Sequence, residues 1–269
     1  MIETESLSFC SRHAEERLLG EITLRARAGE ALALLGSDGS GKTTLLQVLA
    51  GLAPGLIKGN RQGKVQVNGC DPALAPSAKR LNSVGLVLAD PLAQLSGVTD
   101  SVEEEIAWGL GNLGVSSAAM YRRTEDIMRR LNLLPLRRRH PRSLSCGQQQ
   151  LVALASVLVL GAKVLLLDEP GSSLDGKSRQ SLTSLVLDMA AQGHTVVWAT
   201  TQLSEAVGFP RWLYLENGTL AYDGPPCIKL LGAKLAPWTR LAEKAVQKGI
   251  WTGPLPLTLE ETATAWRCK

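Results

Sequence analysis

Short apolar runs alternate with amphipathic segments along most of the chain. The runs at 31–35, 164–168 and 195–199 have the length and aliphatic character of buried strands. Segments with helical spacing follow the first two, over 44–50 and 177–191. Such alternation predicts an α/β fold, with a mostly parallel sheet covered by helices.

A smaller β layer is predicted beside this core. The residues before the run at 31–35 and the segment 63–68 have the pattern of strands bounded by turn residues, and we expect them to form an antiparallel layer. A further strand is predicted over 83–88. Near the end, Asn217-Gly218 predicts a hairpin turn between strands at 212–215 and 219–222.

The middle of the chain predicts a helical subdomain at about 91–143. Residues 101–104 have the form of a capping box and predict a helix through about Trp108. A second helix is predicted over 117–133, where apolar residues such as Ile127 share one face and arginines lie largely off it. We interpret the arginine-rich turn at 137–142 as a solvated charged turn and assign it no role.

The composition is that of an ordinary globular protein of 269 residues, with 45% hydrophobic and 20% charged residues. We expect one main domain over 1–231 and a small C-terminal appendage over 232–269. The formal charge of +4 is slight for this length, so it does not point to nucleic acid as a partner.

Neither export nor membrane insertion is expected. Glu3 and Glu5 lie near the start, where a targeting signal would carry basic residues, and no apolar segment follows them. The apolar stretch 151–167 is interrupted by Gly161 and Lys163 and falls short of the roughly 20 residues that span a bilayer. We interpret it as a buried helix that runs into a buried strand. The five cysteines form no CxxC pair, which favours a reducing cytosol without metal bound through sulfur.

The first chemical motif is the glycine-rich loop GSDGSGKTT between the run at 31–35 and the helix at 44–50. In a strand–loop–helix context such a loop points its backbone N–H groups at a polyphosphate, which a flexible Gly/Ser turn does not do. Lys42 supplies a point charge and Thr43 offers a hydroxyl to Mg²⁺. The predicted nucleotide-binding residues are Gly36, Ser37, Asp38, Gly39, Ser40, Gly41, Lys42, Thr43 and Thr44.

The second motif is a pair of carboxylates, Asp168 and Glu169, at the end of the apolar run 164–168. This end of a parallel strand lies at the sheet edge where phosphates and metal bind. We expect Asp168 to hold Mg²⁺ together with Thr43, and Glu169 to be the catalytic residue that orients or polarises the attacking water.

The third motif, Leu144-Ser145-Cys146-Gly147-Gln148, resembles the LSGGQ signature of the ABC ATPase family at four of five positions. Residues 171–175, GSSLD, resemble the D-loop of that family. The resemblance implies a P-loop NTPase cassette that binds ATP and Mg²⁺, and in which two chains enclose two nucleotides. Ser145, Gly147 and Gln148 would then contact ATP held by a second ABC ATPase subunit.

A finer resemblance is to the ATPases of cobalt transporters and energy-coupling-factor (ECF) transporters. It rests on residues 87–95, 101–109 and 112–114, and on the segment 254–261, which is similar to the dimerisation-type C-terminal domain of those proteins. The resemblance implies a peripheral protein at the cytoplasmic face of the membrane, coupling ATP hydrolysis to uptake of a vitamin or transition-metal ion through separate membrane-embedded subunits. The transported substrate is not encoded in this chain.

The chain departs from the family pattern at several positions. In the family an aromatic ring usually stacks on adenine, and the matching position in this chain falls near Ser11. The nearest aromatic residue is Phe9. Ala89 stands in place of the Q-loop glutamine, although Gln94 is close, and Thr201 stands in place of the switch histidine, next to Gln202. A neutral, short threonine lacks the reach and charge of imidazole. Cys146 adds volume to the signature at a tight interface.

These departures suggest a degenerate half of an ATPase heterodimer, with impaired hydrolysis at its own site. A homodimer that tolerates the substitutions remains open, because Glu169 is present. The sequence also permits a non-hydrolysing nucleotide-gated scaffold, or a soluble ABC ATPase outside transport.

Overall fold

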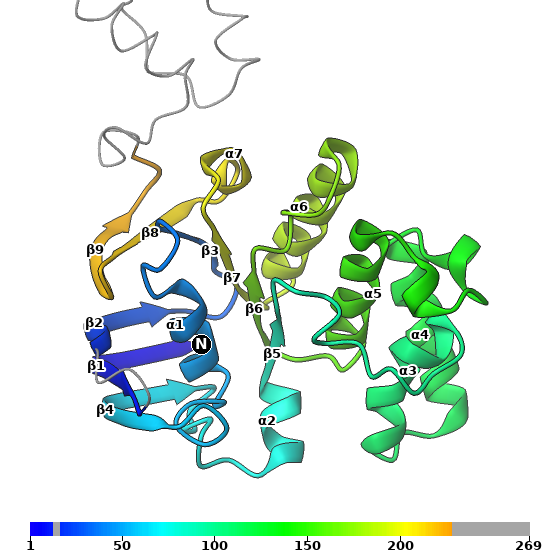
Figure 1. Ribbon diagram of the computed structural model, residues 1–269, viewed down its shortest axis with the longest axis horizontal. Coiled ribbons are helices and arrows are strands. Elements are labelled where there is room, and N and C mark those ends of the chain that lie inside the picture. The colour runs from blue at the N-terminus through cyan, green and yellow to red at the C-terminus, as the bar shows by residue number, and fades with distance from the viewer. Residues whose placement is uncertain (13–16, 228–269) are drawn as a thin grey trace, which may run out of the picture.

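A computed structural model of the chain describes residues 1–12 and 17–227. Its centre is a six-stranded sheet in the order β5-β6-β7-β3-β8-β9 (Figure 1). Parallel pairing joins β5 to β6, β6 to β7, β7 to β3 and β3 to β8, and only β9 runs antiparallel. The strands are β3 (Ala31–Leu35), β5 (Val84–Val87), β6 (Val164–Asp168), β7 (Thr195–Thr200), β8 (Arg211–Glu216) and β9 (Thr219–Gly224). The predicted α/β fold is therefore confirmed.

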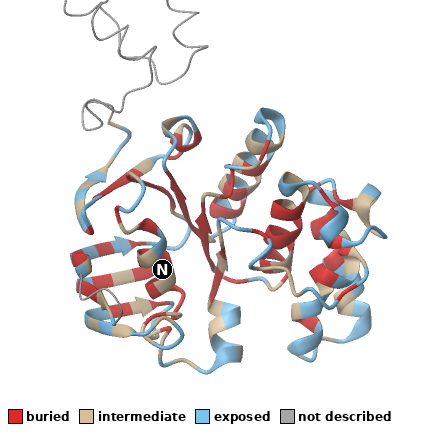
Figure 2. Cartoon of the chain, in the orientation of Figure 1, coloured by how far each residue is buried: buried red, intermediate tan, exposed pale blue. Residues whose placement is uncertain are grey.

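Both faces of this sheet are covered, which is why its central strands are mostly apolar, with polar residues only at their ends. Every residue of β3, β6 and β7 is buried. Within β3, Ala31, Ala33 and Leu35 join one hydrophobic cluster, and Leu32 and Leu34 join the other, because successive side chains point to opposite faces. Figure 2 shows the buried residues running through the middle of the molecule, with exposed residues on the outer faces of the helices.

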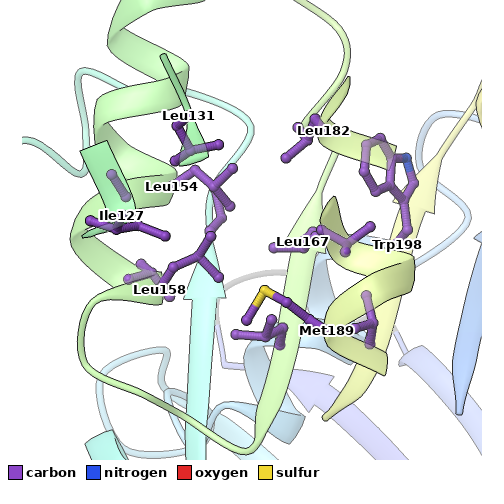
Figure 3. Close-up of a cluster of buried hydrophobic side chains, with 14 of the residues drawn as sticks. Ile127, Leu131, Leu154, Leu158, Leu167, Leu182, Met189 and Trp198 are labelled. Atoms are coloured by element: carbon purple, nitrogen blue, oxygen red, sulfur yellow. The ribbon is translucent and has the colours of Figure 1, made fainter. Parts of the chain in front are cut away.

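The first cluster packs between the sheet and the helices α5 (Cys146–Leu158) and α6 (Gly176–Ala191). Figure 3 shows Leu154 and Leu158 of α5 facing Leu167 of β6, with Trp198 of β7 beside Leu182 of α6. The second cluster contains the apolar face of α1 (Lys42–Leu49) and the buried side of a smaller sheet. The buried helix and strand predicted over 151–167 are thus present as α5 and β6.

The smaller sheet has three antiparallel strands in the order β2-β1-β4 (Figure 1). These are β1 (Ile2–Ser11), β2 (Arg17–Ala26) and β4 (Gly59–Val67). The predicted antiparallel layer is confirmed. The predicted hairpin is confirmed too, since β8 and β9 pair across Asn217 and Gly218, whose φ angles of 47° and 74° are those a two-residue turn requires.

Helices α3 (Val102–Asn112) and α4 (Ser117–Arg130) lie within the predicted helical segment and pack beside α5, on the right in Figure 1. The Ser101 side chain caps α3 as predicted, accepting a hydrogen bond from the Glu104 N–H. The predicted end at Trp108 is wrong, however, because α3 continues through two glycines to Asn112. Gly114 then ends the helix at φ 69°, where the Val115 N–H donates to the Leu110 carbonyl.

Helix α4 ends three residues before the predicted position at 133. Asn132 adopts φ 56°, and the Leu133 N–H donates to the Met128 carbonyl at 2.8 Å. This is the same type of helix stop as in α3, with asparagine in the left-handed position in place of glycine. The apolar pattern predicted a longer helix because Leu131 and Leu133, which follow the last residue of α4, are also buried.

Four short helical elements complete the described chain. They are α2 (Ser77–Ser83), α7 (Leu203–Ala206) and two 3-10 turns, η1 (Leu134–Leu136) and η2 (Pro141–Ser143). The predicted appendage over 232–269, with its segment 254–261, lies outside the described residues. Among the described residues, no helix combines the length and the apolar character needed to cross a membrane.

The core packing generates a stability prediction. Leu154 of α5 is 1% exposed and lies in the buried cluster that also contains Ile127 and Leu167 (Figure 3), so Leu154→Ala removes buried methyl groups from a packed site. We expect a loss of about 2–5 kcal/mol in the free energy of unfolding, measured by urea denaturation. The control is Leu74→Ala, because Leu74 is 82% exposed and its truncation is expected to change stability by less than about 0.5 kcal/mol. Equal effects of the two substitutions would contradict the described packing.

Candidate nucleotide-binding site

The glycine-rich loop connects the end of β3 to the start of α1, as the apolar pattern predicted. Gly39 and Gly41 adopt φ 74° and 101°, which are conformations that residues with a side chain rarely take. A Cβ atom on Gly36 would lie 2.4 Å from the Ser40 Oγ and 2.6 Å from the Leu215 carbonyl oxygen. The loop is therefore closed tightly over the sheet edge, and its first glycine is buried beneath it.

Lys42 begins α1, and its side chain folds back over the loop. Its Nζ donates to the carbonyl oxygens of Gly36 at 2.9 Å and Ser37 at 3.1 Å, and lies 3.9 Å from the Glu169 carboxylate. The lysine is only 6% exposed. A cation held in this position, at the N-terminus of a helix, suits an anionic group that approaches the loop.

Thr43 and Asp168 meet across the sheet edge, although 125 positions separate them in sequence. The Thr43 hydroxyl donates to Asp168 Oδ2 at 2.7 Å. Burial raises the pKa of Asp168, which is 2% exposed, against the opposing effects of the Thr43 hydrogen bond and of Lys42. The other carboxylate oxygen, Oδ1, is buried without a hydrogen-bond partner among the described residues.

An oxygen donor set with one unsatisfied buried carboxylate oxygen fits a hard divalent cation such as Mg²⁺. The described residues contain no group of three or more His, Cys, Asp or Glu side chains that would cage a metal by themselves. A cation bound by Thr43 and Asp168 would therefore take its remaining ligands from phosphate and water, as Mg²⁺ does in nucleotide sites.

Glu169 has a strained backbone at φ 47°, held by its N–H donating to the Ala199 carbonyl at 2.9 Å. Its carboxylate accepts a hydrogen bond of 3.2 Å from the Thr200 hydroxyl and one from the Thr201 backbone. Burial raises its pKa and nearby Glu205 adds to the rise, whereas Lys42 opposes it. A partly desolvated carboxylate directed at the phosphate end of a cleft is suited to orient a water molecule.

These groups line one cleft of about 560 Å³. The predicted residues Asp38 through Thr44 line it together with Asp168 and Glu169, whereas Gly36 and Ser37 lie behind Lys42 and accept from it. The cleft also takes in Arg17, Leu18, Asn217 and Gly218, which the sequence patterns did not single out as site residues. Asn217 and Gly218 carry a local signal only for a turn, and Arg17 and Leu18 carry none, because only the fold brings these residues to the loop.

The signature residues line a different cleft, of about 640 Å³. Ser145 caps α5 through a reciprocal capping box with Gln148, in which the Gln148 N–H donates to Ser145 Oγ and the Ser145 N–H to Gln148 Oε1. A Cβ atom on Gly147 would lie 2.7 Å from the Ser173 carbonyl oxygen, so glycine is required there. The two clefts share no lining residue. Within one chain, the fold does not bring Ser145, Gly147 and Gln148 to the glycine-rich loop.

Two nearby residues do not replace the missing side chains. Gln94 donates to the Leu86 carbonyl at 3.0 Å and accepts from the Leu88 N–H at 2.9 Å, so its amide is bound to the backbone around β5, and Ala89 lines the cleft instead. Phe9 is fully buried against Gly59, and no aromatic ring is among the described residues that line the cleft. The candidate ring for stacking on a base is thus ruled out by its burial.

The fold and this cleft define a P-loop nucleotide-binding protein. The family model described as "ABC transporter" matches residues 19–172, more than half of the chain. The chain therefore belongs to the ABC transporter family, as an ATP-binding protein of that family.

Relatives of known description agree with this. A putative ABC transporter ATP-binding protein of Pyrococcus horikoshii is 39% identical over 93% of this chain and 91% of its own length. The energy-coupling factor transporter ATP-binding protein EcfA1 of Ligilactobacillus salivarius is 34% identical over 84% of this chain and 78% of its own. The solved structure of cbiO1 from Clostridium perfringens, described as part of the ABC transporter complex cbiONQ, has 25% identity and a TM-score of 0.73, covering 92% of this chain and 94% of that one. The chain spans only 66% and 46% of two other curated relatives.

The cation site generates the second prediction, which concerns Asp168→Asn. Because burial raises the pKa of Asp168, its charged form is disfavoured in the folded state, and a neutral amide is expected to raise the Tm of the nucleotide-free protein at pH 7. The same substitution is expected to abolish the extra thermal stabilisation that Mg²⁺ gives in the presence of ATP.

The measurement is a thermal-shift titration with ATP plus Mg²⁺ and with ATP plus EDTA. The matched control is Asp188→Asn, because Asp188 lies on α6 outside the cleft. An unchanged Mg²⁺-dependent shift in Asp168→Asn would remove Asp168 from the metal site.

Proposed function

We propose that the chain is the ATP-binding subunit of an ECF-type or cobalt-type importer, and that it forms the degenerate half of an ATPase heterodimer. In this function, ATP binding and hydrolysis drive uptake of a vitamin or a transition-metal ion through separate membrane-embedded subunits. The protein is peripheral, at the cytoplasmic face of the membrane. The named relatives of the ECF and cbiO type and the matching segments 87–95 and 101–109 support this assignment.

The separation of the two clefts supports a second ATPase subunit. A nucleotide on the glycine-rich loop of one chain lies away from the signature cleft of that same chain. Both motifs act on one nucleotide only when a second chain supplies the opposite one. ATP and Mg²⁺ then act as ligands that favour the closed pair, and release of the hydrolysis products reopens it. The helical segment around α3 and α4 transmits this movement to the membrane subunits.

The proposal that this chain hydrolyses ATP poorly at its own site rests on the side chains at the end of the cleft lined by Lys42 and Glu169, where the phosphates of ATP would lie. Ala89 contributes only a methyl group there. Thr201 and Gln202 are exposed and do not line the cleft, so no long polar donor from the switch segment reaches it. The signature, in contrast, keeps its capping box and the glycine that packs on Ser173. The chain is thus better equipped to complete a partner's site than to hydrolyse ATP at its own.

In the mechanism, Mg²⁺ would be held by Thr43 and Asp168, where it would neutralise charge on the phosphates of bound ATP. Lys42, whose Nζ donates to the Gly36 and Ser37 carbonyl oxygens, supplies the positive charge for the phosphate oxygens. Glu169 orients water at the terminal phosphate. Thr200 and the Thr201 backbone hold that carboxylate in place beside Lys42, and no side chain of Thr201 or Gln202 lines the cleft there.

This chemistry generates the third prediction. We expect Thr201→His to raise the kcat of the purified chain about 10-fold or more, because an added donor at an oxyanion site is typically worth that much or more. The control is Thr201→Ala, which changes size without adding a donor and is expected to leave kcat unchanged. Glu169→Gln in the Thr201→His background should remove the gain.

The decisive test of the function is ATP turnover by the chain alone and after co-expression with a second ATPase and membrane subunits. Slow turnover alone, rapid turnover in the complex and loss of it on Gly147→Trp would support the proposal. Brisk, Glu169-dependent hydrolysis by the chain alone would overturn the degenerate assignment. Nucleotide binding without hydrolysis in any assembly would favour the scaffold, which Ala89 and Thr201 also permit, and recovery without any membrane protein would favour a soluble ATPase.

A further inference from the structure

The nucleotide cleft has two chemically different ends. Strand β6 lies on one side of β3, with β7 between them, and β8 lies on the other side. Asp168 and Glu169, at the end of β6, therefore lie opposite the β8–β9 turn at Asn217 and Gly218, with the glycine-rich loop in between. A nucleotide whose terminal phosphate reaches Asp168 directs its base toward the second end.

The second end of the cleft is built from closely packed backbone. The Gly218 N–H donates to the Ser40 carbonyl at 3.0 Å, and the Gly20 N–H donates to the Gly218 carbonyl at 2.8 Å. A Cβ atom on Gly41 would lie 3.0 Å from the Leu18 carbonyl oxygen, and one on Gly218 would lie 2.5 Å from it. The start of β2, the loop and the hairpin turn are therefore packed backbone to backbone, and the side chains of Arg17 and Leu18 form the wall beyond them.

Arg17 contributes a guanidinium group to this wall. Its Nε donates to the Leu19 carbonyl at 3.3 Å, and its Nη2 lies 3.7 Å from the Glu21 carboxylate. The N–H donors of a guanidinium group lie in its plane, so the hydrogen bond to Leu19 holds the group from its edge and not from a face. The side chain is 52% exposed at the mouth of the cleft.

We propose that Arg17 is the base-binding residue of this chain, with its guanidinium plane stacked on the purine of bound ATP. Guanidinium planes stack on bases through dispersion and cation–π attraction, as aromatic rings do. No described aromatic residue lines the cleft, and the nearest candidate, Phe9, is buried elsewhere. Arg17 thus supplies the flat surface that would otherwise be missing. The proposal rests on nucleotide binding, which is part of the proposed function.

Arg17 has a simpler alternative role, as a positive charge that attracts the phosphates. The two roles separate when the ligand has no base. Tripolyphosphate carries the phosphates of ATP but nothing to stack on, so a stacking residue affects ATP alone and a charged residue affects both ligands.

The fourth prediction follows from this contrast. By calorimetry in the presence of Mg²⁺, Arg17→Ala is expected to weaken ATP binding about 5-fold and to leave tripolyphosphate binding unchanged. Arg17→Lys keeps the charge but loses the plane, so it should bind ATP as weakly as Arg17→Ala. Arg17→Trp restores a flat surface and should recover the affinity. Arg25→Ala, an exposed arginine of the same strand outside the cleft, is the matched control and should change neither ligand.

Three results would overturn the proposal: equal weakening of both ligands by Arg17→Ala, full ATP affinity in Arg17→Lys, or no effect of Arg17→Ala on ATP. Failure of the proposed function has a different signature. In that case the unaltered chain binds neither ATP nor tripolyphosphate, and Lys42→Ala changes nothing.

Discussion

The hydrogen bond between Thr43 and Asp168 joins the helix that follows the glycine-rich loop to the end of β6, and it depends on the order of the strands in the sheet. One partner lies in the first turn of the helix after β3 and the other ends β6, two strands away in a parallel sheet. Parallel strands bring their carboxyl ends to one edge, where loop amides and buried carboxylates face the same space. The cost is a desolvated acid whose second oxygen has no described partner, and a bound divalent cation would offset that cost.

The two hydrophobic clusters explain how this edge is kept in position. Alternate residues of β3 are shared between a cluster under α5 and α6 and another under α1 and the antiparallel sheet. A shift of either layer would move the glycine-rich loop relative to Asp168. The loop is further held by the β8–β9 turn through Gly218 and Ser40, so the phosphate site rests on three separate elements.

The same arrangement divides the chemistry of the chain between two clefts. The phosphate cleft has binding groups and one candidate catalytic carboxylate, but a methyl group at Ala89 and no switch side chain. The signature cleft keeps the close packing of Gly147 on Ser173 that its turn requires. This separation of the two clefts within one chain is the observation on which the proposed pairing with a second ATPase chain rests.

The sequence by itself determined the elements whose information is local. The apolar runs that became β3 and β6, the glycine-rich loop, the Ser101 cap and the Asn217-Gly218 turn all follow from periodicity or turn chemistry within a few residues. The tertiary structure alone decided the contacts that depend on strand order and packing. It buried Phe9, turned Gln94 onto the backbone around β5, stopped α4 at a left-handed asparagine and placed Arg17 at the cleft. No local pattern encodes these outcomes, because each is set by neighbours that are distant in sequence or by a backbone conformation that packing selects.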